Sequence, residues 1–434
     1  MSLDTNASAA RPIVISCDKC GQQLRAPANA AGKKVRCPAC QAVCEVPTDR
    51  HGGAPVDVAE LAEADTGGPA FGLAGQSPRP APPLPGGSSP AAPVSKPSPG
   101  AEPGRLRGLA ALAQGGERTR TREIFERITG EISKIYVGQE ELMIGVLVAL
   151  FSSGHVLIES VPGLGKTLFV RTLGRTLGLG FGRIQFTADL MPSDITGAPI
   201  FDMKQQEFRF RPGPVFTQLL LADEINRSPA KSHAALLEIM QEYRVTVDGV
   251  SHKIQRPFLV MATQNPVESE GTYNLPEAQL DRFMFKLVAD YPTESEEADI
   301  LRMHSLQRDI NRRLEEELEV VTGAEEILRI TQENAKVRVD DRLVDYINKI
   351  VRQTRTWPQF HMGASPRAGL ALMQGARTLA AFAGRDYAVP DDVVELALPV
   401  LRHRVVLTAE AEVEGHSVDE LLGRVVRSVE VPQL

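Results

Sequence analysis

The chain has 434 residues, of which 42% are hydrophobic and 24% are charged, enough for more than one packed domain. Its 48 basic and 55 acidic residues leave a net charge of −7, which argues against binding to nucleic acid or anionic membranes through overall charge. Aromatic residues make up only 5%, which argues against a stacking platform for single strands. The start carries no apolar leader and the chain no apolar run of about 20 residues, so we expect a cytoplasmic protein without a membrane span.

All five cysteines lie between residues 17 and 44. Cys17-x2-Cys20 and Cys37-x2-Cys40 are separated by 16 residues, a spacing that predicts two turns placing four thiolates around one Zn²⁺ ion. Cys44 could replace Cys40 as the fourth ligand. A thioredoxin-like redox motif is the alternative, but it would need one pair in an α/β setting. Because domains below about 40 residues usually need a metal to fold, we expect the zinc to be structural. The module resembles the small zinc ribbons at the front of many bacterial multidomain proteins.

Composition divides the rest of the chain. We predict a disordered tail over residues 1–12, the zinc module over 13–48 and a disordered linker rich in Ala, Pro and Gly over 49–118. Between Pro78 and Pro103 there are ten prolines in 26 residues. Proline fixes φ and lacks a backbone N–H, and this stretch has too few large apolar residues to offset the entropy of ordering.

Residues 119–293 predict an α/β core, because short apolar runs alternate with helical stretches and this alternation favours a parallel sheet covered on both faces. The predicted strands are Val156–Glu159, Arg183–Phe186, Leu219–Ala222, Phe258–Thr263 and Phe283–Val288. Residues 294–434 predict an all-helical lid domain. The predicted helices are Arg122–Ile135 and Leu168–Leu177 in the core, and Ser295–Leu306, Asp341–Thr354, Arg367–Ala383 and Asp391–Leu401 in the lid.

A phosphate-binding loop follows the first of these strands. It consists of Ser160, Val161, Pro162, Gly163, Leu164, Gly165, Lys166 and Thr167. Backbone N–H groups of this loop and the helix after it can surround the phosphates of ATP, Lys166 can reach the β- and γ-oxygens, and Thr167 can bind Mg²⁺. The motif asks for glycine where this chain has Ser160, and a non-glycine residue at positive φ costs about 1–2 kcal/mol, so we expect weakened but surviving binding.

Two further strands end in polar side chains at the edge where α/β sheets bind ligands. Asp223 would hold Mg²⁺ through water, and Glu224 would act as general base toward the attacking water. Asn265 could hydrogen-bond both the γ-phosphate and that water. Two solvated carboxylates capping a strand, and an ordinary Asn-Pro turn, are the structural alternatives. The phosphate loop upstream favours the catalytic interpretation.

The order and phrasing of these motifs resemble the MoxR family of AAA+ ATPases. The resemblance runs from about Arg122 to Val429, and the phrases that carry it are Arg183–Thr187, Asp189–Gly197, Ala222–Arg227, Leu275–Phe283 and Gly363–Ala368. It implies a homo-oligomeric ring, expected to have six subunits, in which Arg282 is an arginine finger for the neighbouring subunit. The alternative is that Arg282 is a surface residue paired with Asp281. The resemblance also implies Arg367 as a lid sensor of the nucleotide and Gln139 as part of the adenine pocket.

Two segments predict β-hairpins. Val245–Val250 contains an Asp-Gly turn between alternating residues, and Ala198–Phe210 has apolar arms around a polar tip. The resemblance suggests that such inserts face the substrate, whereas on structural grounds alone they could be simple edge ribbons.

The main functional hypothesis is an ATPase that remodels or matures client proteins. The resemblance implies partners that carry a von Willebrand factor A domain, and the zinc module would recruit a partner through its tether. Two rival hypotheses are a motor acting on nucleic acid, which the net charge of −7 argues against, and a nucleotide-binding scaffold with little hydrolysis, which Ser160 motivates.

Overall fold

The computed structural model describes residues 13–16, 23–26, 34–36, 40, 43–45, 103, 106, 108–112, 116–266, 273, 275–305 and 309–433. The chain divides into two compact units, Met1–Ser89 and Pro90–Leu434.

The described residues of the first unit form two antiparallel hairpins. One pairs β1 (Ile13–Ser16) with β2 (Gln23–Ala26), and the other pairs β3 (Lys34–Arg36) with β4 (Val43–Glu45). In sequence, one cysteine pair lies between the strands of each hairpin. Cys17, Cys20 and Cys37 lie outside the described residues, whereas Cys40 is described and half-buried. The zinc site therefore stays a prediction, as do the disordered tail and most of the predicted linker.

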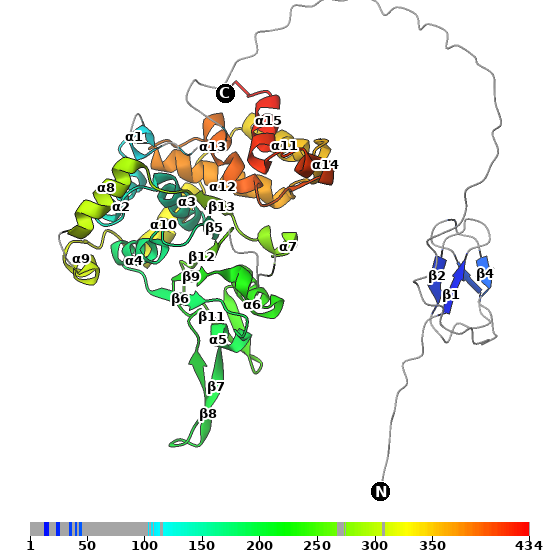
Figure 1. Ribbon diagram of the computed structural model, residues 1–434, viewed down its shortest axis with the longest axis horizontal. Helices are drawn as coiled ribbons and strands as arrows, with labels where there is room; N and C mark the ends of the chain where they lie inside the picture. Colours follow the sequence, from blue (N-terminus) through cyan, green and yellow to red (C-terminus); the bar gives the residue numbers. More distant parts are fainter. Residues whose placement is uncertain are drawn as a thin grey trace, which may run out of the picture. The chain divides into compact units, whose positions relative to one another are not determined.

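A five-stranded parallel sheet lies at the centre of the second unit (Figure 1). Its strand order is β13-β5-β12-β9-β6. The strands are β5 (Val156–Ser160), β6 (Phe181–Gln185), β9 (Leu219–Asp223), β12 (Leu259–Gln264) and β13 (Phe285–Ala289). All five predicted strands are confirmed, with ends that differ by at most two residues.

Both faces of this sheet are buried, as the continuous apolar runs predict. Val156 and Ile158 of β5 belong to one apolar cluster, and Leu157 between them belongs to another. This alternation follows from the two-residue period of a strand. The first cluster joins the sheet to the core helices α2 (Arg120–Ser133), α3 (Glu140–Phe151) and α4 (Lys166–Leu177) and to the lid. The second joins it to α6 (Ala230–Glu242), so the core has three layers.

Two hairpins extend from the core, and both were predicted. β7 (Gly197–Asp202) pairs with β8 (Glu207–Pro212), and β10 (Arg244–Val247) pairs with β11 (Val250–Lys253). The second turn is formed by Asp248 and Gly249 at φ 48° and 78°, the two left-handed residues of a type I′ turn. Figure 1 shows the β7–β8 hairpin projecting well away from the body of the unit. Short helices α5 (Pro192–Thr196) and α7 (Glu277–Leu280) and the 3-10 turn Ile225–Arg227 complete the core.

The C-terminal part is mainly helical. Its helices are α8 (Glu294–Ser305), α9 (Ile310–Glu316), α10 (Ala324–Asn334), α11 (Asp341–Thr356), α12 (Pro366–Phe382), α13 (Pro390–Leu401), α14 (Ala409–Val413) and α15 (Val418–Ser428). The prediction of an all-helical lid was wrong in one respect, because β14 (Phe360–Met362) pairs with β15 (Val406–Leu407). Such short strands carry no periodic signal and form only where the fold brings them together.

The lid and the core share one apolar interior. Phe125 of α2 stacks on Phe382 of α12 with ring centroids 4.2 Å apart, and Phe285 of β13 belongs to the same cluster as Leu396 of α13. The predicted linker also ends earlier than residue 118. Leu106 and Leu112 are only 4% and 1% exposed, and α1 (Leu109–Leu112) lies within the predicted linker. Two leucines in a Gly- and Ala-rich stretch are too weak a pattern to predict buried residues before residue 118.

Among the described residues, no helix is both long and apolar enough to cross a membrane.

Candidate nucleotide-binding site

The phosphate loop connects β5 to α4, as the sequence predicts. Gly163 and Gly165 have φ of 90° and 71°, in the left-handed region that only glycine enters without strain. Gly165 is the N-cap of α4, so the first N–H groups of that helix have no helical acceptor and can bind an anion. A Cβ built on Gly163 would meet no atom within 4 Å, so the space above this backbone is open.

Ser160 carries none of the strain that the motif comparison predicts. It is the last residue of β5, is 2% exposed and is absent from the residues with positive φ. Its Oγ accepts a hydrogen bond of 2.8 Å from Lys166 Nζ, which also donates to Val161 O at 3.3 Å. The expected cost at this position was therefore wrong, because the residue continues the strand instead of forming the turn. Ser160 instead holds the lysine at the loop.

Asp223 and Glu224 stand at the carboxyl end of β9, and one hydroxyl links them to the next strand. Thr263 Oγ1 of β12 donates to Asp223 Oδ1 at 2.7 Å and accepts from Glu224 N at 2.9 Å. Glu224 has φ 56°, a left-handed conformation that is uncommon for this residue type and typical of constrained functional positions. The sequence gave no role to Thr263, although its place two residues before Asn265 on a buried strand was visible.

The edge strand β6 contributes two polar contacts to these acids that the sequence did not reveal. Arg183 Nη2 lies 2.7 Å from Asp223 Oδ2 and donates to Gln185 Oε1 at 2.9 Å. Gln185 Nε2 in turn donates to Glu224 Oε2 at 2.7 Å. Arg183 thus occupies one carboxylate oxygen of Asp223 and also orients the amide that holds Glu224. Arg227 Nε adds a weaker contact to Glu224 at 3.4 Å.

The strand order brings the predicted site residues together. β12 lies between β5 and β9, so Asn265, directly after β12 and 9% exposed, stands between the phosphate loop and the acids. Burial lowers the pKa of Lys166, and the charges of Asp223 and Glu224 act in the opposite direction. Lys166 at the start of α4 and the two acids at the end of β9 thus lie along one edge of the sheet, the arrangement that a Mg²⁺–triphosphate site needs.

A cavity of about 170 Å³ adjoins the phosphate loop. Its lining includes Tyr136, Val137, Gln139, Leu164, Pro292 and Met303. Tyr136 donates from its hydroxyl to Leu164 O at 3.3 Å, and burial raises the pKa of Tyr136 to about 12, so the phenol stays protonated. The Gln139 amide donates to Asp290 O, and Gln139 itself has φ 57°. An apolar slot with a few polar groups beside a phosphate loop is the shape that an adenine ring requires.

The two predicted arginines lie on either side of the core–lid junction. Asp281 does not pair with Arg282, so that alternative was wrong; its carboxylate meets Arg404 Nε at 2.7 Å and Arg367 Nη1 at 3.9 Å. Arg367 follows the N-cap Ser365 and Pro366 at the start of α12, as predicted. Arg282 is half-buried, and its Nε has no hydrogen-bond partner among the described residues. Neither guanidinium bonds to the phosphate loop in this structure.

These residues fit ATP and Mg²⁺. Open space above Gly163, free N–H groups at the start of α4 and the adjoining cavity match a triphosphate and a base. Thr167 and Asp223 offer the hard oxygen ligands that Mg²⁺ prefers. When bound, Mg²⁺ would supply neutralisation of charge on the phosphate oxygens.

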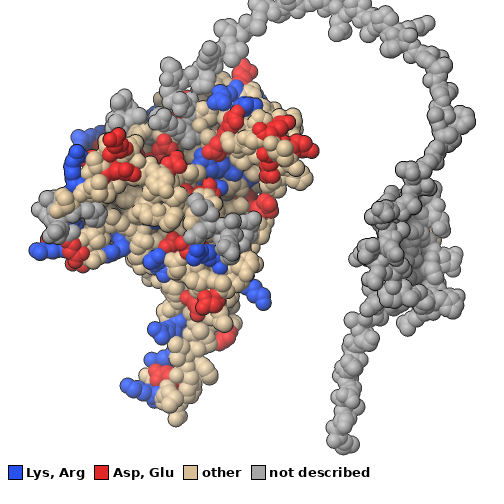
Figure 2. All heavy atoms as spheres, in the orientation of Figure 1, with Lys and Arg blue, Asp and Glu red and all other residues tan. Residues whose placement is uncertain are grey.

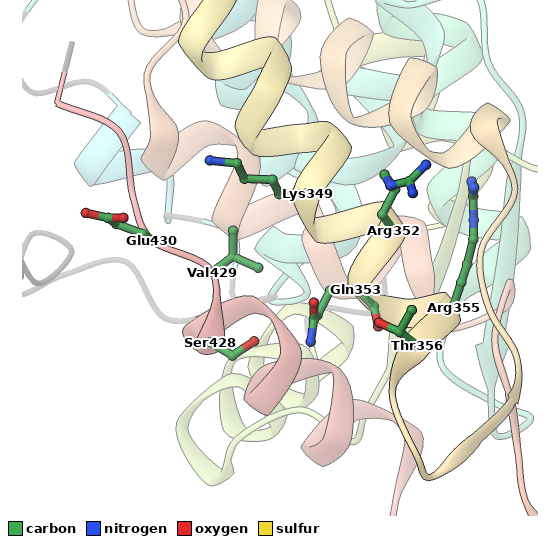
Figure 3. A pocket seen from close by; sticks show the side chains of 8 residues that line it. All are labelled: Lys349, Arg352, Gln353, Arg355, Thr356, Ser428, Val429 and Glu430. Carbon is green, nitrogen blue, oxygen red and sulfur yellow. The ribbon is translucent and has the colours of Figure 1, made fainter. Parts of the chain in front are cut away.

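Another hollow, of about 510 Å³, contains none of these residues (Figure 3). It lies between the C-terminal half of α11 and the segment Ser428–Glu430 that ends α15 and follows it. Figure 3 shows the basic side chains of α11 pointing in different directions, with Lys349 turned away from Arg352 and Arg355. They do not converge on a common point.

Comparison with known proteins agrees with this geometry. The model of the ATPase family associated with various cellular activities (AAA) matches residues 155–285, and an AAA lid domain matches residues 352–425. The chaperone MoxR1 of Mycobacterium tuberculosis is 43% identical over 359 residues, which cover 81% of this chain and 90% of that protein. The chain belongs to the MoxR family of AAA+ ATPases.

Two further proteins are similar to most of this MoxR-family chain. The uncharacterized protein YeaC of Bacillus subtilis is 47% identical over 301 residues, covering 69% of this chain and 92% of that protein. The crystal structure of a protein from Cytophaga hutchinsonii that is assigned as an ATPase matches with a TM-score of 0.68 and 40% identity, covering 72% of this chain and 96% of that one. The MoxR-family chain is an ATPase, and ATP with Mg²⁺ is its substrate and metal.

Proposed function

We propose that this MoxR-family ATPase uses ATP hydrolysis to remodel or mature client proteins as a homo-oligomeric ring of six subunits. The observation that carries the proposal is that Lys166, the acids after β9 and Asn265 lie along one sheet edge, in a chain that also projects a hairpin with exposed apolar side chains. The similarity to a protein named a chaperone also supports a role in remodelling client proteins.

In this proposal each residue of the sheet edge has one task. Lys166 leaves Ser160 and binds phosphate oxygens of the nucleotide. Glu224 takes the proton of the attacking water as general base, a contribution of about 10²- to 10⁴-fold. Asn265 orients that water. Gln185 holds Glu224 Oε2 at 2.7 Å, and release of this hydrogen bond would make the carboxylate more basic for this step.

The ring is proposed because, among the residues that the structure describes, neither Arg282 nor Arg367 bonds to the phosphate loop of its own subunit. Arg282 is offered as the finger for a neighbouring subunit, where it would neutralise charge that develops during phosphoryl transfer. Among the residues described, the Arg282 side chain makes no ion pair or hydrogen bond, which supports a role outside its own chain. Arg367 is proposed to contact the nucleotide of its own subunit when the lid closes; it is exposed and held only by a long contact to Asp281.

The β7–β8 hairpin is proposed to contact the client. Met203 is 83% exposed and Phe208 is 74% exposed, although apolar side chains of this size are normally buried. Phe208 also packs edge-to-face on Phe201 with ring centroids 5.2 Å apart, so the exposed surface is a defined pair of rings. Figure 2 shows Lys and Arg (blue) and Asp and Glu (red) interspersed with other residues (tan) along the hairpin. Such a surface suits an unfolded or loosely folded protein segment.

The client role is tested by measuring ATP turnover with and without a permanently unfolded protein such as casein. We expect Phe208→Ser to lose the stimulation by casein while the basal turnover stays within about twofold of the wild type. Val413→Ser is the matched control, because Val413 is 89% exposed but lies at the end of α14 in the lid. Equal stimulation in the wild type and Phe208→Ser would refute a client role for the hairpin.

The N-terminal module is proposed to be a zinc ribbon that recruits a partner. Paired strands flank each cysteine pair in sequence, which is the topology of a ribbon with one knuckle per hairpin. The proposed partner is a protein with a von Willebrand factor A domain, and the tether would raise its effective concentration near the ring. Metal analysis should find about one zinc per chain, and Cys17→Ser with Cys20→Ser should release it. Much less than one zinc on the intact, reduced chain would refute the site.

The rival hypotheses lose support from the structure. The scaffold hypothesis was motivated by expected backbone strain at Ser160, but Ser160 does not have a positive φ. For the nucleic-acid motor, the face in Figure 2 carries interspersed Lys, Arg, Asp and Glu side chains without a continuous basic stripe.

A further inference from the structure

Asp281 connects the lid to the segment that carries Arg282. Its carboxylate is 18% exposed and receives hydrogen bonds from Ser365 Oγ at 3.1 and 3.0 Å and from Arg404 Nε at 2.7 Å. Ser365 is the N-cap of α12, and Arg404 lies in the loop after α13, so both partners belong to the lid. The side chain of Asp281 is therefore held from the lid side, and Arg282 is the next residue along the chain.

Arg404 holds the backbone of the same segment. Its side chain is 3% exposed, and its guanidinium donates to Asp281 O at 3.2 Å, Phe283 O at 2.6 Å and Met284 O at 3.1 Å. His403 adds a bond of 3.0 Å to the same Phe283 carbonyl. The backbone on both sides of Arg282 is thus bonded to one buried cation of the lid. A displacement of the lid that keeps these bonds must carry the Arg282 segment with it.

The nucleotide sensor begins from the same anchor. Arg367 N donates to Ser365 Oγ at 3.2 Å, while Arg367 Nη1 lies 3.9 Å from Asp281 Oδ2. The Arg367 side chain is 54% exposed, so this contact is weak and a phosphate can replace it. Ser365 and Asp281 therefore connect Arg367, the proposed sensor, to Arg282, the proposed finger.

We propose that Asp281 is a positioning residue that couples the lid of one subunit to the Arg282 that the same subunit offers to its neighbour. The inference rests on the proposed function, since it requires that Arg282 act in the site of an adjacent subunit. Lid movement at one nucleotide site would then set the finger at the next site. Communication between neighbouring sites would follow from this one carboxylate and its partners Ser365 and Arg404.

The test uses mixed rings of full-length chains in which the finger and the nucleotide come from different subunits. A Lys166→Ala subunit keeps its finger but loses its own nucleotide, and an Arg282→Ala subunit keeps its nucleotide site but offers no finger. Each alone should be inactive, and the mixture should regain ATP turnover at the mixed interfaces. Asp281→Asn is then added to either the finger donor or the acceptor.

With Asp281→Asn in the donor, we expect kcat of the mixture to fall by about 10- to 100-fold at an unchanged KM, because a misplaced cation costs that much in the transition state. In the acceptor the same substitution should change kcat by less than about fivefold, because the acceptor supplies no finger. Asp392→Asn in the donor is the matched control. It breaks a comparable buried pair of the lid, with Arg385 Nη2 at 2.7 Å, away from Arg282.

Three results would overturn the inference. They are an equal loss of kcat with Asp281→Asn in the donor and in the acceptor, an unchanged kcat with Asp281→Asn in the donor, and an equal loss of kcat with Asp392→Asn in the donor. Ser365→Ala in the donor removes the hydrogen bond to Asp281 and the N-cap bond from Arg367 N without leaving Arg404 unpaired, so it gives a second test if Asp281→Asn fails to fold. We expect it to lower kcat by about 3- to 10-fold in the donor only. If Arg282→Ala alone keeps wild-type turnover, the proposed finger fails and the inference fails with it, before any Asp281 variant is compared.

Discussion

The contact between Arg183 and Asp223 predicts how a substitution of Arg183 changes the affinity of the site for Mg²⁺. In this structure its guanidinium holds Asp223, the carboxylate that we assign to Mg²⁺, at 2.7 Å. Mg²⁺ and Arg183 therefore compete for the negative charge of one carboxylate, so the guanidinium weakens the site for the ion. Replacing Arg183 by Gln removes the competitor, so the site should bind Mg²⁺ more tightly.

The magnitude follows from the exposure of the pair. The side chains of Arg183 and Asp223 are 46% and 13% exposed, so the ion pair lies near the surface and is screened by water. Pairs of this kind contribute about 0.2–1 kcal/mol. Since 1.4 kcal/mol corresponds to a factor of ten, the loss of the pair should lower the half-saturating Mg²⁺ concentration by about 1.4- to 5-fold.

The assay is ATP turnover at saturating ATP over a series of free Mg²⁺ concentrations. Arg209→Gln is the control, because Arg209 pairs with Glu207 at 2.9 Å on the distant β7–β8 hairpin, where both side chains are exposed. It should leave the Mg²⁺ dependence unchanged. A half-saturating Mg²⁺ concentration that is unchanged or higher in Arg183→Gln would refute competition for Asp223 and indicate that Arg183 assists the metal or the nucleotide.

Three other variants test separate parts of the account. Burial lowers the pKa of His155 from 6.5 to about 4, so the folded protein keeps this histidine neutral while the unfolded chain takes up a proton first. The free energy of unfolding that depends on this neutral histidine is fully present above pH 6.5 and is lost as the pH falls toward 4. By about pH 5 the loss is about 2 kcal/mol. Urea unfolding of the wild type should show this loss, and His155→Gln should lack it. Ser160→Gly should not raise turnover, because it relieves no strain; a gain of several-fold would mean that the serine does impair the loop. Gln185→Ala should raise turnover without client by about 2- to 10-fold by freeing Glu224, and a decrease would show that Gln185 assists the base.

The sequence predicted what depends on local patterns. Buried parallel strands are continuous apolar runs, so all five were found within two residues. Asp248-Gly249 predicted its hairpin because these two residues tolerate the left-handed angles that the turn requires. The phosphate loop has a fixed spacing, and its glycines have the positive φ angles expected of such a turn.

What the sequence missed depends on contacts between distant segments. Gln185 lies opposite Asp223 in the register of β6 and β9, and nothing in either segment reveals that pairing. Asp281 is bonded by Arg404, 123 residues further along the chain. Ser160 was misjudged because a motif position was equated with a backbone angle, whereas here the strand extends through that residue.

The most direct test of the central claim, that the edge of this sheet hydrolyses ATP with Glu224 as general base, is to compare wild type and Glu224→Gln in binding and turnover of Mg-ATP. The wild type should hydrolyse ATP, and Glu224→Gln should bind it with similar affinity while its kcat falls by about 10²- to 10⁴-fold. Turnover by Glu224→Gln at the wild-type rate, or no turnover by either protein once rings have assembled, would contradict the account.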